Sequence, residues 1–454
     1  MTSDQKPEGN SHTPAGSAIG SDPADASRQS QFLDVITREE ATSRFHRWLK
    51  LEPLGSEPVS LFSALGRVLA EDIVSDVDVS GFDRSNVDGF AVRSIDTAGA
   101  MEEDPRVLVL NGEMLSPGIE PQQSVLPGTA TAIATGAMLP RGADAVVMIE
   151  HTDRVPPATG SPADASPAEI EITRAVAPGD NLTFAGTDIA LGETVLRQGQ
   201  LITSREIGVL AAIGRESVNV WRKPTVAIIS TGNEIVPPGA PRPPGRVYDS
   251  NLPILAATVA ELGGEPVPLG VVDDDEPRLR EMLQRAMDCD VVLMSGGTSK
   301  GAGDLSSRVV SELTDPGVVA HGVALKPGKP VCLAVTGGKP VVILPGFPTS
   351  AIFTFHEFVA PVIRMLGGHR ADERETVMAT LPMRINSDRG RTEYLLVGLV
   401  HAGEGLAAYP MGKGSGSVTT WSGADGFVTI GQQTEIVEAG TRVPVQLLSR
   451  QLAP

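Results

Sequence analysis

A change of pattern near residue 224 constrains the fold more than any other feature of this chain. From there to about residue 366, short apolar runs alternate with longer segments in which apolar residues have helical spacing. This alternation is typical of βαβ units on a parallel sheet with right-handed crossovers. The sequence therefore predicts a central α/β domain, and ligands of such sheets bind in loops at the carboxyl ends of the strands.

The predicted strands of this domain are rich in Val, Ile and Leu, and the predicted helices begin or end at capping residues. Strands are expected at 225–231, 265–272, 290–297, 331–335 and 340–346, and helices at 249–264, 276–287, 306–315 and 349–366.

The chain before and after this domain has a different pattern. Short β-prone pieces separated by Gly and Pro occupy residues 70–160, and similar pieces follow Gly367-Gly368. The chain has 49 Gly and 36 Pro, which favours turn-rich β and α/β architectures over a helical bundle. We therefore predict a multidomain α/β plus β protein, with an additional helix near residues 32–49 that Thr37 would cap.

Residues 1–30 consist mainly of Ser, Pro, Gly, Ala and Asp. Such a composition buries too little apolar surface to offset the entropy lost on ordering, so we predict a disordered tail.

The net charge of −19 argues against general binding to nucleic acid or to an anionic membrane surface. Cys289 and Cys332 lie in apolar runs, which is typical of buried thiols in a reducing compartment, and the seven histidines lack the spacing of zinc ligands. No run of about 18 apolar residues and no signal peptide is apparent. We expect a cytoplasmic protein.

Two loops that follow predicted strands contain polar groups. Ser230–Glu234 places hydroxyl groups, a Gly and a carboxylate at a strand end, and Ser295–Asp304 contains four glycines together with hydroxyl groups and a lysine, which favours anion binding. Backbone N–H groups of such a Gly-rich loop can converge on an anion. The second loop matches neither the phosphate loop GxxxxGK[ST] nor the dinucleotide fingerprint GxGxxG.

Two further loops complete the set. Lys326–Pro330 holds two lysines in a loop that its prolines make rigid, and fixed cations suit a phosphate or a dithiolate. Leu344–Ser350 leads into the last predicted helix, whose first N–H groups could bind an anion. Each loop alone would also fit an ordinary turn, so the prediction of a ligand site depends on all four occurring together.

Eight motifs, read together and in order, resemble the molybdopterin molybdenumtransferase family, called MoeA in bacteria and the E domain of gephyrin in animals. They are FDRSNVDGFAV, ATGAMLPRGADAVV, GTDI, STGNEI, GRVYDSN, SGGTSKGAGD, LKPGKP and LPGFPTS. The resemblance covers residues from about 32 to 450. It implies an elongated linker domain, a β-rich lid, an α/β domain similar to the molybdopterin adenylyltransferases, and a C-terminal β domain.

On this resemblance the domains are expected at 31–70 with 172–222 for the linker domain, 71–171 for the lid, 223–370 for the molybdopterin-binding α/β domain, and 371–454 for the C-terminal β domain. The family forms homodimers in which the α/β domain of one subunit meets the lid of its partner. A molybdopterin adenylyltransferase is a further expected partner.

The family's reaction inserts molybdate into adenylylated molybdopterin, with Mg²⁺ bound and AMP released. The resemblance implies catalytic roles for Asp88, Asp188, Glu234, Asp274 and Asp304, and metal binding by Glu234, Asp274 and Asp304. The residues implied to bind the substrates are Thr135, Ser295, Gly296, Gly297, Ser299, Lys326, Lys329, Pro345, Pro348 and Ser415.

Three positions depart from the family pattern. The family often has Asp in place of Asn233, and commonly has basic residues in place of Gly322 and near Leu396. Loss of two cations would weaken the binding of an oxyanion such as molybdate. Two alternatives therefore stay open, a molybdopterin adenylyltransferase-like enzyme and a catalytically weakened pterin-binding or scaffold paralogue.

Overall fold

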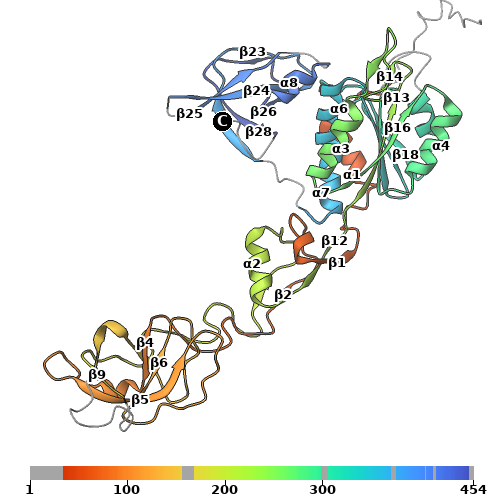
Figure 1. The fold of residues 1–454 in the computed structure, drawn as a ribbon. Helices are drawn as coiled ribbons and strands as arrows, with labels where there is room; N and C mark the ends of the chain where they lie inside the picture. Colours follow the sequence, from red (N-terminus) through yellow and green to blue (C-terminus); the bar gives the residue numbers. More distant parts are fainter. Residues whose placement is uncertain are drawn as a thin grey trace, which may run out of the picture. The chain divides into compact units, whose positions relative to one another are not determined.

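The computed structural model describes residues 34–155, 168–297, 305–369, 375–403, 405–412 and 416–448. The chain divides into two compact units, of which one is Leu54–Arg222 and the other combines the segments before and after it (Figure 1). The predicted tail at residues 1–30 lies outside the described residues.

A six-stranded sheet forms the centre of the α/β domain, in the order β16-β13-β17-β21-β20-β18. The parallel part consists of β13 (Thr225–Thr231), β16 (Glu265–Val272), β17 (Val291–Ser295) and β21 (Lys339–Leu344). All four were predicted from their apolar runs. In β13 every residue after Thr225 is buried, as expected for a strand covered by helices on both faces.

The edge of this sheet departs from the predicted parallel arrangement. Strand β20 (Cys332–Thr336) pairs antiparallel with β21 and with β18 (Pro316–His321), a strand that was not predicted. The β20–β21 hairpin turns at Gly337 and Gly338, whose φ values are +60° and +85°. A Gly-Gly pair between two apolar runs favours a tight hairpin, so the sequence did contain this signal.

Helices cover both faces of the sheet. Helices α3 (Asn251–Glu261), α6 (Pro348–Thr354) and α7 (Ala360–Leu366) lie on one face, and α4 (Glu276–Ala286) lies on the other (Figure 1). Helix α5 (Leu305–Ser311) packs with α4 through a shared apolar core. Between α6 and α7, residues Phe355–Val359 form a π-helical turn, because a proline in the next turn has no N–H to donate.

Helix α1 (Arg38–His46) is capped by Thr37, whose Oγ1 accepts the N–H of Glu40, as predicted. The expected linker domain included residues 31–70, but residues 34–53 belong to the unit that contains the α/β domain. The reason is that the apolar side of α1, including the fully buried Phe45, packs against strands β18 and β20.

The C-terminal domain is a closed β-barrel. Its strands are β22 (Thr376–Thr380), β24 (Thr392–Ala402), β25 (Gly405–Pro410), β26 (Gly426–Ile430) and β28 (Arg442–Leu447). Strand β24 pairs with both β25 and β26, and β28 joins β26 to β22, which closes the ring. Closure removes unpaired strand edges.

One strand links this barrel to the α/β domain. Strand β19 (Leu325–Lys326) comes from the predicted lysine loop, and it pairs in parallel with the start of β24. The two lysines of that loop are thereby placed beside the barrel.

The unit Leu54–Arg222 contains two kinds of core. A six-stranded sheet in the order β7-β4-β6-β5-β9-β8 has an apolar core on each face. Its strands are β4 (Gly89–Val92), β5 (Arg106–Leu115), β6 (Thr129–Ile133), β7 (Ala145–Met148), β8 (Thr152–Arg154) and β9 (Glu169–Ile172).

The other core of this unit is built from both ends of the segment. Strand β1 (Ser56–Ser60) pairs with β12 (Ser217–Trp221), and α2 (Ser204–Ala212) packs beside them. The β-rich part is thus inserted into a domain made from two chain segments. The predicted fold class, a central α/β domain with β-rich domains before and after it, is confirmed. None of the described helices is long and apolar enough to cross a membrane.

Candidate functional site

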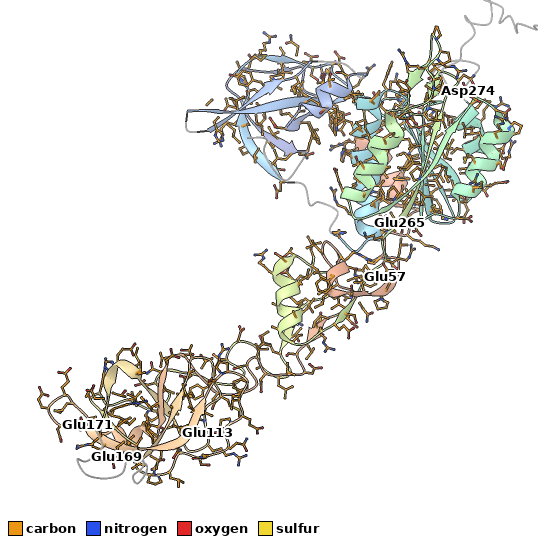
Figure 2. All side chains as sticks on the ribbon, in the orientation of Figure 1. Glu57, Glu113, Glu169, Glu171, Glu265 and Asp274 are labelled. Atoms are coloured by element: carbon orange, nitrogen blue, oxygen red, sulfur yellow. The ribbon has the colours of Figure 1, made fainter. Side chains whose placement is uncertain are left out.

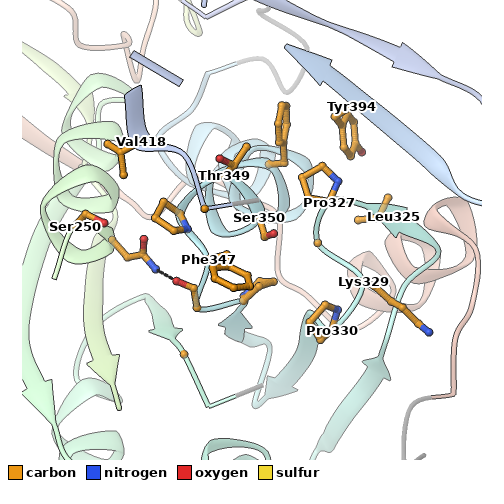
Figure 3. Close-up of a pocket in the computed structure, with 18 of the residues that line it drawn as sticks. Ser250, Leu325, Pro327, Lys329, Pro330, Phe347, Thr349, Ser350, Tyr394 and Val418 are labelled. Atoms are coloured by element: carbon orange, nitrogen blue, oxygen red, sulfur yellow. Dashed lines mark hydrogen bonds between the residues drawn. The ribbon is translucent and has the colours of Figure 1, made fainter. Parts of the chain in front are cut away.

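A cavity of about 1170 Å³ lies in the unit that contains the α/β domain and the C-terminal barrel (Figure 3). Of the predicted site residues, six line it: Glu234, Gly296, Lys326, Lys329, Pro345 and Pro348. The lining also includes Tyr248, Asp249, Asn251, Phe347, Arg391 and Glu393, which the sequence analysis did not select. The cavity therefore combines the four predicted loops with the start of α3 and with strand β24.

The Gly-rich loop packs tightly against the end of β13. Gly296 has φ +106°, and a Cβ atom there would lie 2.3 Å from the carbonyl oxygen of Thr231. Gly297 has φ +68°, and its Cβ would lie 2.3 Å from Oγ of Ser306. The positive φ favours glycine at both positions, and close contact with the Thr231 backbone at Gly296 and with the Ser306 side chain at Gly297 leaves little room for a Cβ, which is a structural reason for the motif in addition to any ligand contact.

A buried amide joins three of the segments at the base of the cavity. Asn251 is 7% exposed, and its Nδ2 donates to Oγ of Ser295 and to the carbonyl oxygen of Gly346, both at 2.8 Å; the dashed line in Figure 3 marks the bond to Gly346. Since the Gly346 carbonyl can only accept, the orientation of the amide is fixed. The predicted residue Ser295 therefore does not line the cavity, but its hydroxyl group helps to hold Asn251, which does.

Asn251 also presents an unsatisfied group. Its Oδ1 is buried and accepts no hydrogen bond from any residue in the described part of the chain. The neighbouring Asp249 is 6% exposed and caps α3, because its Oδ1 accepts the N–H groups of Asn251 and Leu252. From the sequence these residues were predicted only to begin a helix, although the GRVYDSN motif contains both.

Two predicted acids lie at the carboxyl ends of neighbouring strands, Glu234 after β13 and Asp274 after β16 (Figure 2 labels Asp274 at the opposite end of β16 from Glu265). Asn233 holds their loops together, because its Oδ1 accepts the N–H of Asp274 at 3.0 Å. Asp274 is exposed at the surface, but partial desolvation of its carboxylate raises its pKa, and the charges of Glu234 and Asp273 raise this pKa further, whereas the hydrogen bond with Asn233 lowers it.

These carboxylates are hard oxygen ligands of the kind that Mg²⁺ prefers. Among the described residues, no group of three His, Cys, Asp or Glu side chains could hold a metal ion. Glu234 and Asp274 would supply two ligands, and the predicted third ligand, Asp304, lies outside the described residues, as do Ser299 and Ser415.

The lysine loop carries two cations in different environments. The Nζ of Lys326 lies 2.8 Å from Oδ2 of Asp388 and 3.6 Å from Oε2 of the buried Glu393. The bond to Asp388, with the charge of Glu393, raises the pKa of Lys326. Lys329 and Arg391 also line the cavity, and neither forms an ion pair with any residue that the structure describes. These two side chains are the available cations of the cavity.

The two positions at which the family commonly has basic residues differ in their placement. Leu396 lines the cavity and is 5% exposed. Gly322 is buried at φ +98° and is not among the lining residues. A side chain at Gly322 would strain the backbone, so of these two positions only 396 could add a cation to this cavity.

The remaining predicted residues belong to the other unit. Asp88 and Thr135 form one local cluster, because Oδ1 of Asp88 accepts the N–H of Thr135 at 2.7 Å and its hydroxyl at 2.9 Å. These bonds lower the pKa of Asp88, the backbone bond most. Asp188 is exposed, and its N–H donates to the carbonyl oxygen of Val79.

Comparison with known proteins agrees with the family resemblance over most of the chain. Residues 36–214 match the family model of the MoeA N-terminal region (domain I and II), residues 227–365 match the model described as "Probable molybdopterin binding domain", and residues 378–448 match the MoeA C-terminal region (domain IV). The residues that line the cavity lie in the second and third of these regions.

Similar proteins are named molybdopterin molybdenumtransferases, and a solved MoeA structure has a similar fold. Molybdopterin molybdenumtransferase 2 of Mycobacterium tuberculosis is 34% identical over 393 residues, which cover 85% of this chain and 94% of that protein. The molybdopterin molybdenumtransferase of Bacillus subtilis is 33% identical, with 87% and 90% covered. The crystal structure of a molybdopterin biosynthesis MoeA protein from Pyrococcus horikosii has 40% identity and a TM-score of 0.80, and covers 92% of this chain and 100% of that one. This chain therefore belongs to the molybdopterin molybdenumtransferase family and is an enzyme of molybdenum cofactor biosynthesis.

Proposed function

We propose that this enzyme inserts molybdate into adenylylated molybdopterin and releases AMP. The observation that carries the proposal is the cavity at the carboxyl ends of β13, β17 and β21, which lies mostly in the region that matches the molybdopterin-binding model. The cavity combines a carboxylate, Glu234, with two cations, Lys329 and Arg391, that form no ion pair with the residues the structure describes. A ligand with a diphosphate and a ring system suits a cavity of this size and composition.

The acids and the cations have different roles in this proposal. Glu234 and Asp274, with Asp304, would hold Mg²⁺, which would neutralise the diphosphate when bound. The raised pKa of Asp274 fits such a role, because a nearby cation would offset the burial and the repulsion that destabilise its charge. The cations would orient the oxyanion and the diphosphate so that the diphosphate can be cleaved in line.

Molybdate is one of the enzyme's substrates in the proposed reaction, and cationic side chains would be needed to bind this anion. Lys326 is engaged by two carboxylates, so Lys329 and Arg391 are better placed to bind an oxyanion. In this account Lys326 positions strand β19 against the barrel and keeps the lysine loop in place. The physiological source of the adenylylated pterin would be a molybdopterin adenylyltransferase, and the cytoplasm is the proposed location.

We further propose that the enzyme acts as a homodimer in which Asp88, Thr135 and Asp188 complete the partner's site. Support comes from exposed apolar residues in the unit Leu54–Arg222, where Phe62 is 100% and Leu65 is 64% exposed. Two large apolar side chains so close in sequence favour a protein contact. Sedimentation should show a dimer, and Phe62→Glu with Leu65→Glu should shift it to monomer, whereas a wild-type monomer at micromolar concentration would contradict the proposal.

A turnover experiment separates the proposed function from its alternatives. The enzyme, Mg²⁺ and adenylylated molybdopterin are incubated with molybdate or tungstate, and AMP and the metal-containing pterin are quantified. An adenylyltransferase-like enzyme would instead consume ATP and molybdopterin without needing molybdate. A scaffold paralogue would bind the pterin and release no AMP. Oxyanion-dependent AMP release is the result that the proposed function requires.

A further inference from the structure

An aromatic ring at the cavity is largely exposed in the part of the chain that the structure describes. Phe347 lines the cavity and is 64% exposed, although Phe is normally among the residues that folding buries. In the view of Figure 3 its ring lies near the middle of the drawn lining residues. Such an exposed ring at a binding cavity provides apolar surface that a ligand can cover.

The backbone holds this ring in place. Phe347 has φ −71° and ψ 131°, the extended conformation that a following proline favours, and Pro348 follows it. The N-terminal neighbour, Gly346, accepts the bond from the buried amide of Asn251. The ring is therefore presented from a loop that is restrained on both sides, which lowers the entropy lost when a ligand binds.

The surroundings of the ring leave its surface accessible. A Cβ atom at Gly416 would lie 3.6 Å from Cδ1 of Phe347, so any larger side chain at this position would cover part of the ring. Tyr248, another lining residue, is 48% exposed, and Arg242 lies over its ring. Pro345, Pro348 and Val418 add apolar surface to the lining.

The same cavity contains the cations Lys329 and Arg391, which have no ion-pair partner among the described residues. A ligand that matches both features has a flat apolar face and an anionic group. We propose that Phe347 stacks against the planar nitrogen heterocycle of a phosphorylated ligand, and thereby determines which ring the cavity accepts. This inference rests on the proposed function, in which the substrate carries two such rings, an adenine and a pterin.

The test is equilibrium binding to the full-length protein, independent of turnover. The probes are AMP, pterin-6-carboxylate and ribose 5-phosphate, because the first two distinguish the rings and the third has the phosphate without a ring. Stacking of a base on an aromatic side chain contributes roughly 1–3 kcal/mol. With about 1.4 kcal/mol per tenfold change in affinity, Phe347→Ala should weaken binding of at least one ring probe by roughly 5- to 150-fold.

Two variants separate stacking from other effects. Phe347→Tyr keeps a ring and should bind the ring probes like the wild type, whereas Phe347→Leu keeps only apolar volume and should resemble Phe347→Ala. Ribose 5-phosphate should bind the wild type and the three Phe347 variants equally, whereas Lys329→Met should weaken the binding of AMP and of ribose 5-phosphate alike. Since the ring is exposed, thermal unfolding of each variant should match that of the wild type.

Several outcomes would overturn the inference. It fails if Phe347→Ala binds both ring probes as tightly as the wild type, or if Phe347→Leu restores binding as well as Phe347→Tyr. It also fails if the wild-type protein binds neither ring probe at millimolar concentration. Failure of the proposed function would give a different pair of results. The ring probes would still bind in a way that depends on Phe347, but the enzyme would release no AMP in response to molybdate.

Discussion

Substitution of Gly296 by alanine tests the packing of the Gly-rich loop against the sheet. The new Cβ would lie 2.3 Å from the Thr231 carbonyl oxygen and 3.0 Å from its Oγ1, so one of the two loops must move by about 1 Å to restore an ordinary contact of about 3.5 Å. The positive φ of +106° adds backbone strain. Gly346 lies directly beside Gly296, so the movement would also change the cavity.

The expected loss of stability is the sum of two costs, the backbone strain and the overpacking. A left-handed conformation costs an alanine about 1–2 kcal/mol, and overpacking costs about 1–3 kcal/mol, so the free energy of unfolding should fall by roughly 2–5 kcal/mol. Gly245→Ala is the matched control, because Gly245 has φ +80° but nothing within 4 Å of its Cβ. In this control the free energy of unfolding should fall only by the cost of the left-handed backbone conformation, about 1–2 kcal/mol.

Urea unfolding followed by circular dichroism gives both free energies, and AMP release is measured on the folded fraction. Gly296→Ala should be the less stable variant and should also lose turnover, while Gly245→Ala keeps turnover. Equal losses of stability in the two variants would refute the argument that backbone approach, and not φ alone, requires glycine in this loop.

Four further predictions concern charged groups and the cavity wall. Asp274→Asn should abolish AMP release. Partial desolvation and the charges of Glu234 and Asp273 raise the pKa of Asp274, so this variant should also raise the thermal midpoint slightly at pH 7, by an amount that solvent screening keeps small because the side chain is exposed, and the gain should disappear below about pH 4. Asp88→Asn should abolish turnover with little change in thermal unfolding, because the amide oxygen can still accept the two hydrogen bonds from Thr135. A large loss of stability with normal turnover would show that Asp88 has a structural role. Lys326→Met should lower the free energy of unfolding in urea by roughly 1–3 kcal/mol, because it removes the lysine beside the buried Glu393 carboxylate. Lys329→Met should chiefly weaken molybdate binding, measured by calorimetry. The reverse pattern would contradict the roles assigned to the two lysines. Leu396→Arg should lower the apparent Michaelis constant for molybdate about tenfold, with Leu396→Met unchanged, unless the wild type already saturates at low-micromolar molybdate.

The elements with strong local patterns could be predicted from the sequence. The strand Thr225–Thr231 is apolar throughout its centre, and Thr37 is a typical N-cap, so short-range physics decides both. The antiparallel edge was missed because the apolar run at 331–335 looks the same in a parallel and in an antiparallel strand. Only the Gly337-Gly338 turn distinguishes the two arrangements.

The contacts of the site were harder to predict because they join segments distant in sequence. Lys326 was expected to be an available cation, but the pairing of β19 with β24 brings it to Asp388 and Glu393, more than 60 residues further along the chain. Asn251 had no sequence signal beyond its motif, since its role depends on how the ends of two strands meet the start of a helix. The identities of the loops were predictable, whereas the pairing of their side chains depended on tertiary packing.

The central claim is that oxyanion insertion and AMP release are coupled in this cavity. A single-turnover experiment tests it most directly, with enzyme in excess over adenylylated molybdopterin, Mg²⁺ present, and molybdate added or withheld. The account predicts one AMP released for each molybdenum bound to the pterin, and no release without molybdate. AMP release at the same rate without molybdate, or molybdenum insertion with the adenylyl group still attached, would contradict it.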